Sequence, residues 1–158
     1  MQNSIIDVYG NRLRVRACGI CIREEKLLLV NHRSITAGDF WGPPGGGISY
    51  GEKAEDCLSR EFKEETGLTI EVGRFLFACE FLYPPLHAIE LFFEVPASEG
   101  TPTTGLDPEM DDKNQIIQEV RFVSWAEIKS FNPASLHGLF QLASNPSEIL
   151  DLRGYFKL

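Results

Sequence analysis

The segment Lys53–Thr66 constrains the fold more than any other part of the chain. Ala54, Leu58 and Phe62 recur at every fourth position, so they form one apolar stripe on a helix. Gly67 follows directly, and glycine is the residue most often found just after the end of a helix. The pattern therefore predicts an amphipathic helix over residues 53–66 that packs on a sheet.

Three carboxylates lie beside that stripe. Glu61, Glu64 and Glu65 are spaced i, i+3 and i+4, which places them within an arc of roughly 100° on the helix surface. Such like charges repel one another, and the C-terminal end of a helix disfavours anions. A solvated acidic face is one interpretation. The other is that a divalent cation stabilises the cluster, since carboxylates in this number suit Mg²⁺ or Mn²⁺.

A longer pattern around the glutamates favours the metal. The sequence reads Gly46-x5-Glu52-x7-Arg60-Glu61-Phe62-x-Glu64-Glu65-x-Gly67-Leu68. It resembles the box of the Nudix hydrolase family, G-x5-E-x7-R-E-U-x-E-E-x-G-U, in which U is a bulky apolar residue, and every fixed position matches. At about 7% usage per residue type, a chance match is on the order of one in 10⁸ per starting position. Similar flanking segments, Trp41–Gly46 and Val120–Ile128, extend the resemblance over residues 12–130.

The resemblance implies both a fold and a reaction. The fold is α/β, an α/β/α sandwich with a mixed β-sheet, and we expect one domain over residues 1–158. The reaction is hydrolysis of the pyrophosphate bond in a nucleoside diphosphate linked to another group, X. The substrate classes left open are a nucleotide sugar or ADP-ribose, a dinucleoside polyphosphate, and a (d)NTP. The cofactor implied is Mg²⁺, with Mn²⁺ as the alternative.

The resemblance also assigns roles to residues of the box. Arg60 matches a residue that orients the carboxylates through ion pairs, and we group it with Glu61 and Glu64 as catalytic. The Gly46 carbonyl and the carboxylate of Glu52 match positions that complete the metal shell. The predicted metal ligands are Gly46, Glu52, Glu61, Glu64 and Glu65.

The general base is left open by the sequence. Glu61 and Glu64 are candidates within the box, and four acids are candidates downstream. Among the downstream acids we include Glu119 in the predicted catalytic set, although an exposed strand residue is the alternative there. The downstream candidates are Glu109, Asp111, Asp112 and Glu119.

The nucleotide itself is not specified. In some subfamilies the residue about 16 positions after the box differs with the substrate. Tyr83, Pro84 and Pro85 all fall in that window, so this position does not indicate which substrate class applies here. Phe40, Trp41 and Tyr83 could stack on a base, with core packing as the favoured alternative. The histidines are isolated in sequence and are expected to be structural or exposed: His32, His87 and His137.

Charge and cysteine content bound the partners and the compartment. With 15 Lys and Arg against 23 Asp and Glu, the net charge is −8, which argues against binding to nucleic acid or to an anionic membrane. We expect a small nucleotide-type substrate, and a homodimer is left open. Cys18 and Cys21 have CxxC spacing but would point to opposite faces of a strand. Reduced thiols near the core, and hence a cytoplasmic location, are favoured over a zinc site.

The remaining pattern predicts several strands and short helices around the box. We expect strands over 12–22, 27–32, 69–83, 88–95 and 118–125, with Gly73 as a bulge. We expect a loop over 34–40, neither helix nor central strand over 41–47, and a polar loop over 96–115. A helical turn is expected over 126–130 and a short helix over 133–143, capped by Asn132.

Two other functions are compatible with this fold. A Nudix-fold module that binds a nucleotide without cleaving it would differ in showing no turnover, and the intact box carboxylates count against it. An isomerase of isoprenoid diphosphates would want a catalytic cysteine and additional histidine ligands for the metal, which the scattered histidines do not supply.

Overall fold

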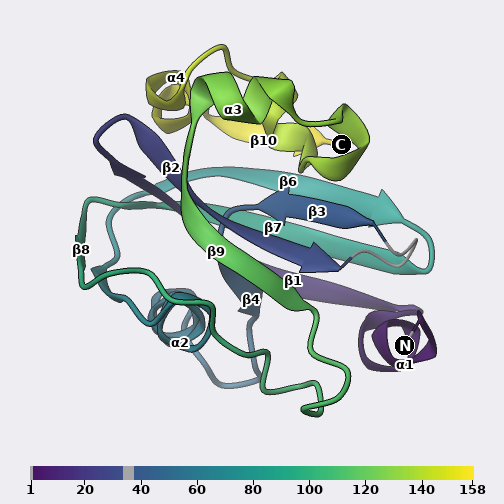
Figure 1. Ribbon diagram of the computed structural model, residues 1–158. Coiled ribbons are helices and arrows are strands. Elements are labelled where there is room, and N and C mark those ends of the chain that lie inside the picture. Colours follow the sequence, from purple (N-terminus) through teal and green to yellow (C-terminus); the bar gives the residue numbers. More distant parts are fainter. Residues whose placement is uncertain (1, 34–37) are drawn as a thin grey trace.

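A computed structural model describes residues 2–33 and 38–158 (Figure 1). The main sheet has the strand order β10-β6-β7-β1-β2-β3, with β4 paired to β1 and β9 paired to β2. The pairings of β1 with β7 and of β10 with β6 are parallel and the others are antiparallel, so the sheet is mixed. Its strands are β1 (Arg12–Arg23), β2 (Lys26–Arg33), β3 (Asp39–Gly42), β4 (Gly45–Gly47), β6 (Phe75–Tyr83), β7 (Leu86–Val95), β9 (Ile117–Ser124) and β10 (Gly154–Lys157).

Helices cover both faces of this sheet. The helix α2 lies on one face, and α3 and α4 lie on the other (Figure 1). The α-helices are α1 (Gln2–Tyr9), α2 (Ala54–Thr66), α3 (Trp125–Ser130) and α4 (Pro146–Asp151). A two-stranded ladder, β5 (Thr69–Glu71) with β8 (Ala97–Glu99), lies apart from the main sheet. None of the helices described here is long and apolar enough to cross a membrane.

Each face of the sheet has its own core, which confirms the predicted α/β sandwich. Leu58 and Phe62 of α2 are fully buried in one core, as the apolar stripe predicted. The other core contains Phe92 and lies under α3 and α4. Cys18 and Cys21 belong to different cores, so the prediction of opposite faces is confirmed. All four cysteines are free and buried.

The box helix ends as predicted because its end is set locally. Gly67 has φ 75°, a left-handed conformation that favours glycine, and its N–H donates to the carbonyl of Lys63 at 3.1 Å. The strand expected over 69–83 is instead interrupted, giving β5 and β6. Gly73 lies between them and donates its N–H to the Glu94 carbonyl at 2.7 Å.

Three other expectations were wrong in part. Residues 34–37 of the loop expected over 34–40 lie outside the described residues, and Asp39 and Phe40 belong to β3. The segment 41–47 is neither helix nor central strand, as expected, since β3 ends the sheet order and β4 lies off it, paired to β1. The polar loop expected over 96–115 contains the short strand β8. The helix expected over 133–143 is two short 3₁₀ helices, Pro133–Ser135 and Gly138–Gln141. Asn132 caps the first, as predicted. The second begins after His137, whose N–H donates to the Trp41 carbonyl at 2.9 Å and so breaks the helical pattern.

Candidate active site

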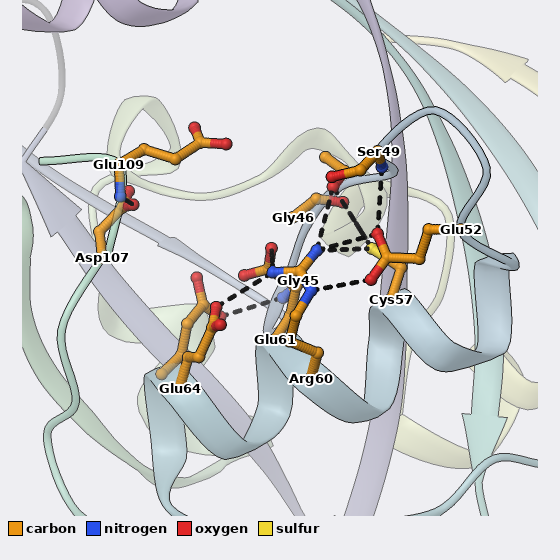
Figure 2. Close-up of polar contacts among 12 residues, drawn as sticks. Gly45, Gly46, Ser49, Glu52, Cys57, Arg60, Glu61, Glu64, Asp107 and Glu109 are labelled. Atoms are coloured by element: carbon orange, nitrogen blue, oxygen red, sulfur yellow. Dashed lines mark hydrogen bonds and ion pairs between the residues drawn. The ribbon is translucent and has the colours of Figure 1, made fainter.

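The site begins where β4 meets α2 (Figure 2). Gly46 faces the carboxyl group of Glu61 so closely that a Cβ at this position would lie 2.2 Å from it. Only glycine therefore fits here without moving that carboxylate. Cys57 of α2 donates its thiol to the carbonyls of Gly46 and Gly47, at 3.6 and 3.5 Å. These contacts hold β4 (Gly45–Gly47), which we call the glycine strand, against the acidic side of α2.

Arg60 draws three of the predicted carboxylates together. Its Nε lies 2.8 Å from Glu52 Oε1, and its Nη1 lies 2.9 Å from Glu61 Oε1 and 3.1 Å from Glu64 Oε2. The expectation that Arg60 orients the carboxylates through ion pairs agrees with this geometry. Glu52 also accepts the N–H of Ser49, and these contacts lower the pKa of Glu52 to about 2.

The fourth carboxylate is held separately. Glu65 is buried and accepts the N–H of Gly45 at 3.1 Å, and its other oxygen lies 3.5 Å from His32 Nε2. Burial and the neighbouring Glu65 raise the pKa of Glu61 to about 7, against the lowering effect of Arg60. The ionised cluster therefore carries more negative charge than Arg60 balances.

This donor set fits a divalent cation. Glu61, Glu64 and Glu65 offer hard oxygen ligands, and a cation beside them would stabilise the ionised form of Glu61. In residues 2–33 and 38–158 no group of acidic, histidine or cysteine side chains already converges as a metal shell. Arg60 contacts one oxygen of Glu61 and one of Glu64, which leaves the second oxygen of each carboxylate to bind a cation.

A cavity of about 600 Å³ opens beside the carboxylates, a volume in the range of small-molecule sites. Gly46, Glu61, Glu64 and Glu65 line it, and so does Arg60. Glu52 is absent from its lining and faces Arg60 instead, so of the predicted ligands Glu52 alone lies outside the cavity wall.

The structure separates the downstream acids. Glu109 lines the cavity together with Asp107, and its side chain extends toward the α2 carboxylates (Figure 2). Glu119 does not line the cavity. It forms an ion pair with Arg121 at 2.7 Å and its side chain is 47% exposed. Our inclusion of Glu119 in the catalytic set is thus not supported by its position, because β9 turns this side chain away from the box. Asp111 and Asp112 are also outside the cavity lining.

The aromatic candidates are separated in the same way. Phe40 and Tyr83 line the cavity, whereas Trp41 is buried and stacks on Phe131 with ring centroids 5.3 Å apart. Phe81, which we did not select, also lines the cavity and meets Phe40 edge to face at 6.0 Å. The histidines, although isolated in sequence, all reach the cavity wall: His32, His87 and His137.

Basic residues of β1 were missed by the sequence argument. Arg14 and Arg16 line the cavity, and the signal that could have found them is the alternation of arginine along an otherwise apolar strand. Arg16 donates to Glu90 at 2.5 Å and to the Gly45 carbonyl at 3.0 Å. Glu90 is buried and also accepts from His137 Nε2 at 2.6 Å, since the Leu139 N–H donates to the other ring nitrogen.

Comparison with known proteins assigns the family. A model of the NUDIX domain matches residues 12–142. The chain is 31% identical over 91 residues to an ADP-ribose pyrophosphatase of Methanocaldococcus jannaschii. This match covers 56% of this chain and 54% of the relative. It is 41% identical over 44 residues to an RNA pyrophosphohydrolase of Bartonella clarridgeiae, covering 28% and 25%. The chain thus spans about half or less of the length of the curated relatives it matches.

The solved structures agree on the fold. A MutT NUDIX hydrolase from Burkholderia pseudomallei superposes with a TM-score of 0.66 over 83% of this chain and 95% of that one, at 20% identity. At that identity the likeness establishes the fold alone. The domain match covers most of the chain and includes the helix, the glycine strand and the carboxylates described above, and the protein therefore belongs to the Nudix family.

Proposed function

We propose that the protein is a Mg²⁺-dependent pyrophosphohydrolase, with Mn²⁺ as an alternative metal, that hydrolyses the P–O–P bond of a nucleoside diphosphate linked to a group X. The observation that carries this proposal is that Glu61, Glu64 and Glu65 line one 600 Å³ cavity beside Gly46. The two curated relatives described above are named a pyrophosphatase and a pyrophosphohydrolase, which supports the same reaction class.

The chain's own residues would divide the work as follows. Glu61, Glu64 and Glu65 would hold a divalent cation, which would supply charge neutralisation and activation of water. Arg60 orients the carboxylates, and the glycine strand lets backbone groups approach the pyrophosphate without an intervening Cβ. Of the candidate general bases, Glu61, Glu64 and Glu109 line the cavity, and we propose that one of these three accepts the proton of the attacking water.

The test is a substrate panel under metal control. ADP-ribose, a nucleotide sugar, a dinucleoside polyphosphate and a (d)NTP are incubated with Mg²⁺, and release of phosphate or mononucleotide is measured. We expect turnover of at least one substrate and its complete loss in excess chelator, with recovery when Mg²⁺ is restored. Full activity in chelator would contradict the proposed metal dependence. Tight nucleotide binding without product would indicate a binding module instead of an enzyme.

A substitution at Gly46 is expected to disable the site without changing its charges. Gly46→Ala would place a Cβ 2.2 Å from the Glu61 carboxyl group, so that carboxylate must move away from the ligand position. We expect kcat to fall by about 100-fold, since ligand misplacement of about 1 Å has effects of this order. Gly51→Ala is the comparison, because a Cβ there meets nothing within 4 Å, although its φ of 84° adds some strain. Equal activity losses in the two variants would contradict the steric argument.

We also propose that the chain works as one domain on small nucleotides in the cytoplasm. The compartment is suggested by the four free, buried cysteines, since thiols stay reduced there. The net charge of −8 would keep nucleic acid away from the surface.

A further inference from the structure

Arg14 of β1 is a basic residue of the cavity that contacts an aromatic ring. It is half-buried and lines the same cavity as the α2 carboxylates. Within the described part of the chain its guanidinium makes no hydrogen bond and no ion pair, while its main chain pairs with Ala88 of β7. Its contact is with an aromatic face, since its guanidinium carbon lies 4.3 Å from the centre of the Tyr9 ring. By contrast, the next arginine on the strand, Arg16, is bound to Glu90 and to a backbone carbonyl.

The charges around Arg14 leave it incompletely balanced. Burial and the neighbouring Arg16 lower its pKa, while Tyr9, Glu109 and Asp107 act in the opposite direction. Neither acid is within ion-pair distance of Arg14, and Asp107 accepts the Tyr9 hydroxyl proton at 2.5 Å. A guanidinium with five donors, half-buried and unpaired, is suited to bind an anion from solution.

Arg14 is also placed next to the proposed metal site. Its Nη2 lies 3.5 Å from the point where a Cβ of Gly47 would be, so it lies over the glycine strand. The preceding glycine, Gly46, is the one that abuts Glu61. An anion on Arg14 would therefore lie beside a pyrophosphate bound at the carboxylates, on the side of the cavity closed by α1.

We propose that Arg14, supported by the Tyr9 ring, binds a further phosphate of the substrate, beyond the pyrophosphate unit at the carboxylates. This rests on the proposed function and narrows it to chains of three or more phosphates, as in a nucleoside triphosphate or a dinucleoside polyphosphate. ADP-ribose and nucleotide sugars have only the two phosphates of the pyrophosphate, so they would leave Arg14 unused.

The kinetic test compares Arg14→Ala with Arg12→Ala. Arg12 is on the same strand, is exposed, and donates to the Asp7 carbonyl, so its variant removes the same charge outside the cavity. For a (d)NTP and diadenosine tetraphosphate we expect Arg14→Ala to raise KM about tenfold or more, the loss expected for one charged hydrogen bond. Any ADP-ribose activity and all Arg12→Ala values should stay within about twofold of wild type.

A binding measurement tests the proposal without turnover. Calorimetry with inorganic tripolyphosphate and with pyrophosphate, at one buffered free Mg²⁺ concentration, should show a loss of about tenfold for tripolyphosphate alone in Arg14→Ala. Tyr9→Leu, which removes the ring beneath the Arg14 guanidinium, should also lose affinity for tripolyphosphate. Thermal melting of each variant identifies a folding defect. Arg14→Lys, which keeps the positive charge, is the conservative comparison for Arg14→Ala.

The two proposals fail differently. Absence of turnover in the wild type would overturn the proposed function, while a selective loss of tripolyphosphate binding in Arg14→Ala would still support the phosphate subsite. Two results for Arg14→Ala would overturn the phosphate subsite: equal changes in KM for all substrates, or unchanged affinity for tripolyphosphate. Neither result would contradict the proposed hydrolase function.

Discussion

Glu61→Gln is expected to lower kcat about a thousandfold or more while the protein remains folded. The carboxylate faces Gly46, Arg60 and the cavity, and its amide replacement keeps the shape but loses the negative charge that would hold the cation. Glu64→Gln should have an effect of similar size. The measurements are kcat for the best substrate of the panel and the Mg²⁺ concentration that gives half-maximal rate.

The matched control is Glu55→Gln, at the exposed start of the same helix. It makes the same chemical change on α2, away from the cavity, and should leave kcat within about twofold of wild type. Circular dichroism of all three variants should show the same helix content. Glu61→Gln with full Mg²⁺-dependent activity would rule out the proposed ligand role of Glu61.

Glu90→Ala is expected to cause the largest loss of stability, about 3–5 kcal/mol of unfolding free energy in urea denaturation. Glu90 is 2% exposed and is held between Arg16 and His137. Its removal leaves the half-buried guanidinium of Arg16 without its ion-pair partner. Glu94→Ala on the same strand removes a more exposed ion pair, with Arg74 at 2.8 Å, and should cost about 1 kcal/mol or less. Equal losses in both variants would contradict this assignment.

Glu90 is also expected to make the stability of the fold depend on pH in the acid range. Burial would raise the pKa of Glu90, but His137 and Arg16 outweigh it and hold the pKa at about 2. Because an unfolded glutamate titrates near about 4.3, Glu90 stabilises the fold above that pH. Its contribution is lost as the pH falls from about 5 to about 2. The stability difference between wild type and Glu90→Ala should therefore shrink over this range, and a constant difference would show that Glu90 is not responsible.

The parts of the fold predicted correctly are those with local signals. The limits of α2 follow from its apolar stripe and from Gly67, and the strand positions follow from β-branched and aromatic runs. The helix expected over 133–143 was wrong because a single long-range hydrogen bond, from His137 to Trp41, overrides the local pattern. No short window of sequence contains that contact.

In the candidate site, too, the residues that were predicted are those with local sequence signals. The box residues lie on one helix and one adjoining strand, so spacing alone places Glu61, Glu64 and Gly46 together. The residues that the sequence argument missed, such as Arg14 and Glu90, reach the cavity through the pairing of distant strands. Glu119 illustrates the converse, since its strand was predicted but the face that its side chain takes depends on the pairing of β9 with β2.

The parallel pairing of β1 with β7 has a consequence for the order of folding. Arg16 and Glu90, which face each other in this ladder, are 74 positions apart in the chain. Closing a loop of that length is entropically costly before its contacts form, and such topologies fold slowly. The box helix can form early on its own signals, but the cavity wall opposite it exists only once these distant strands have met. A partly folded chain would thus carry the proposed metal ligands without a cavity beside them, and the proposed hydrolysis would return only once these distant strands have paired.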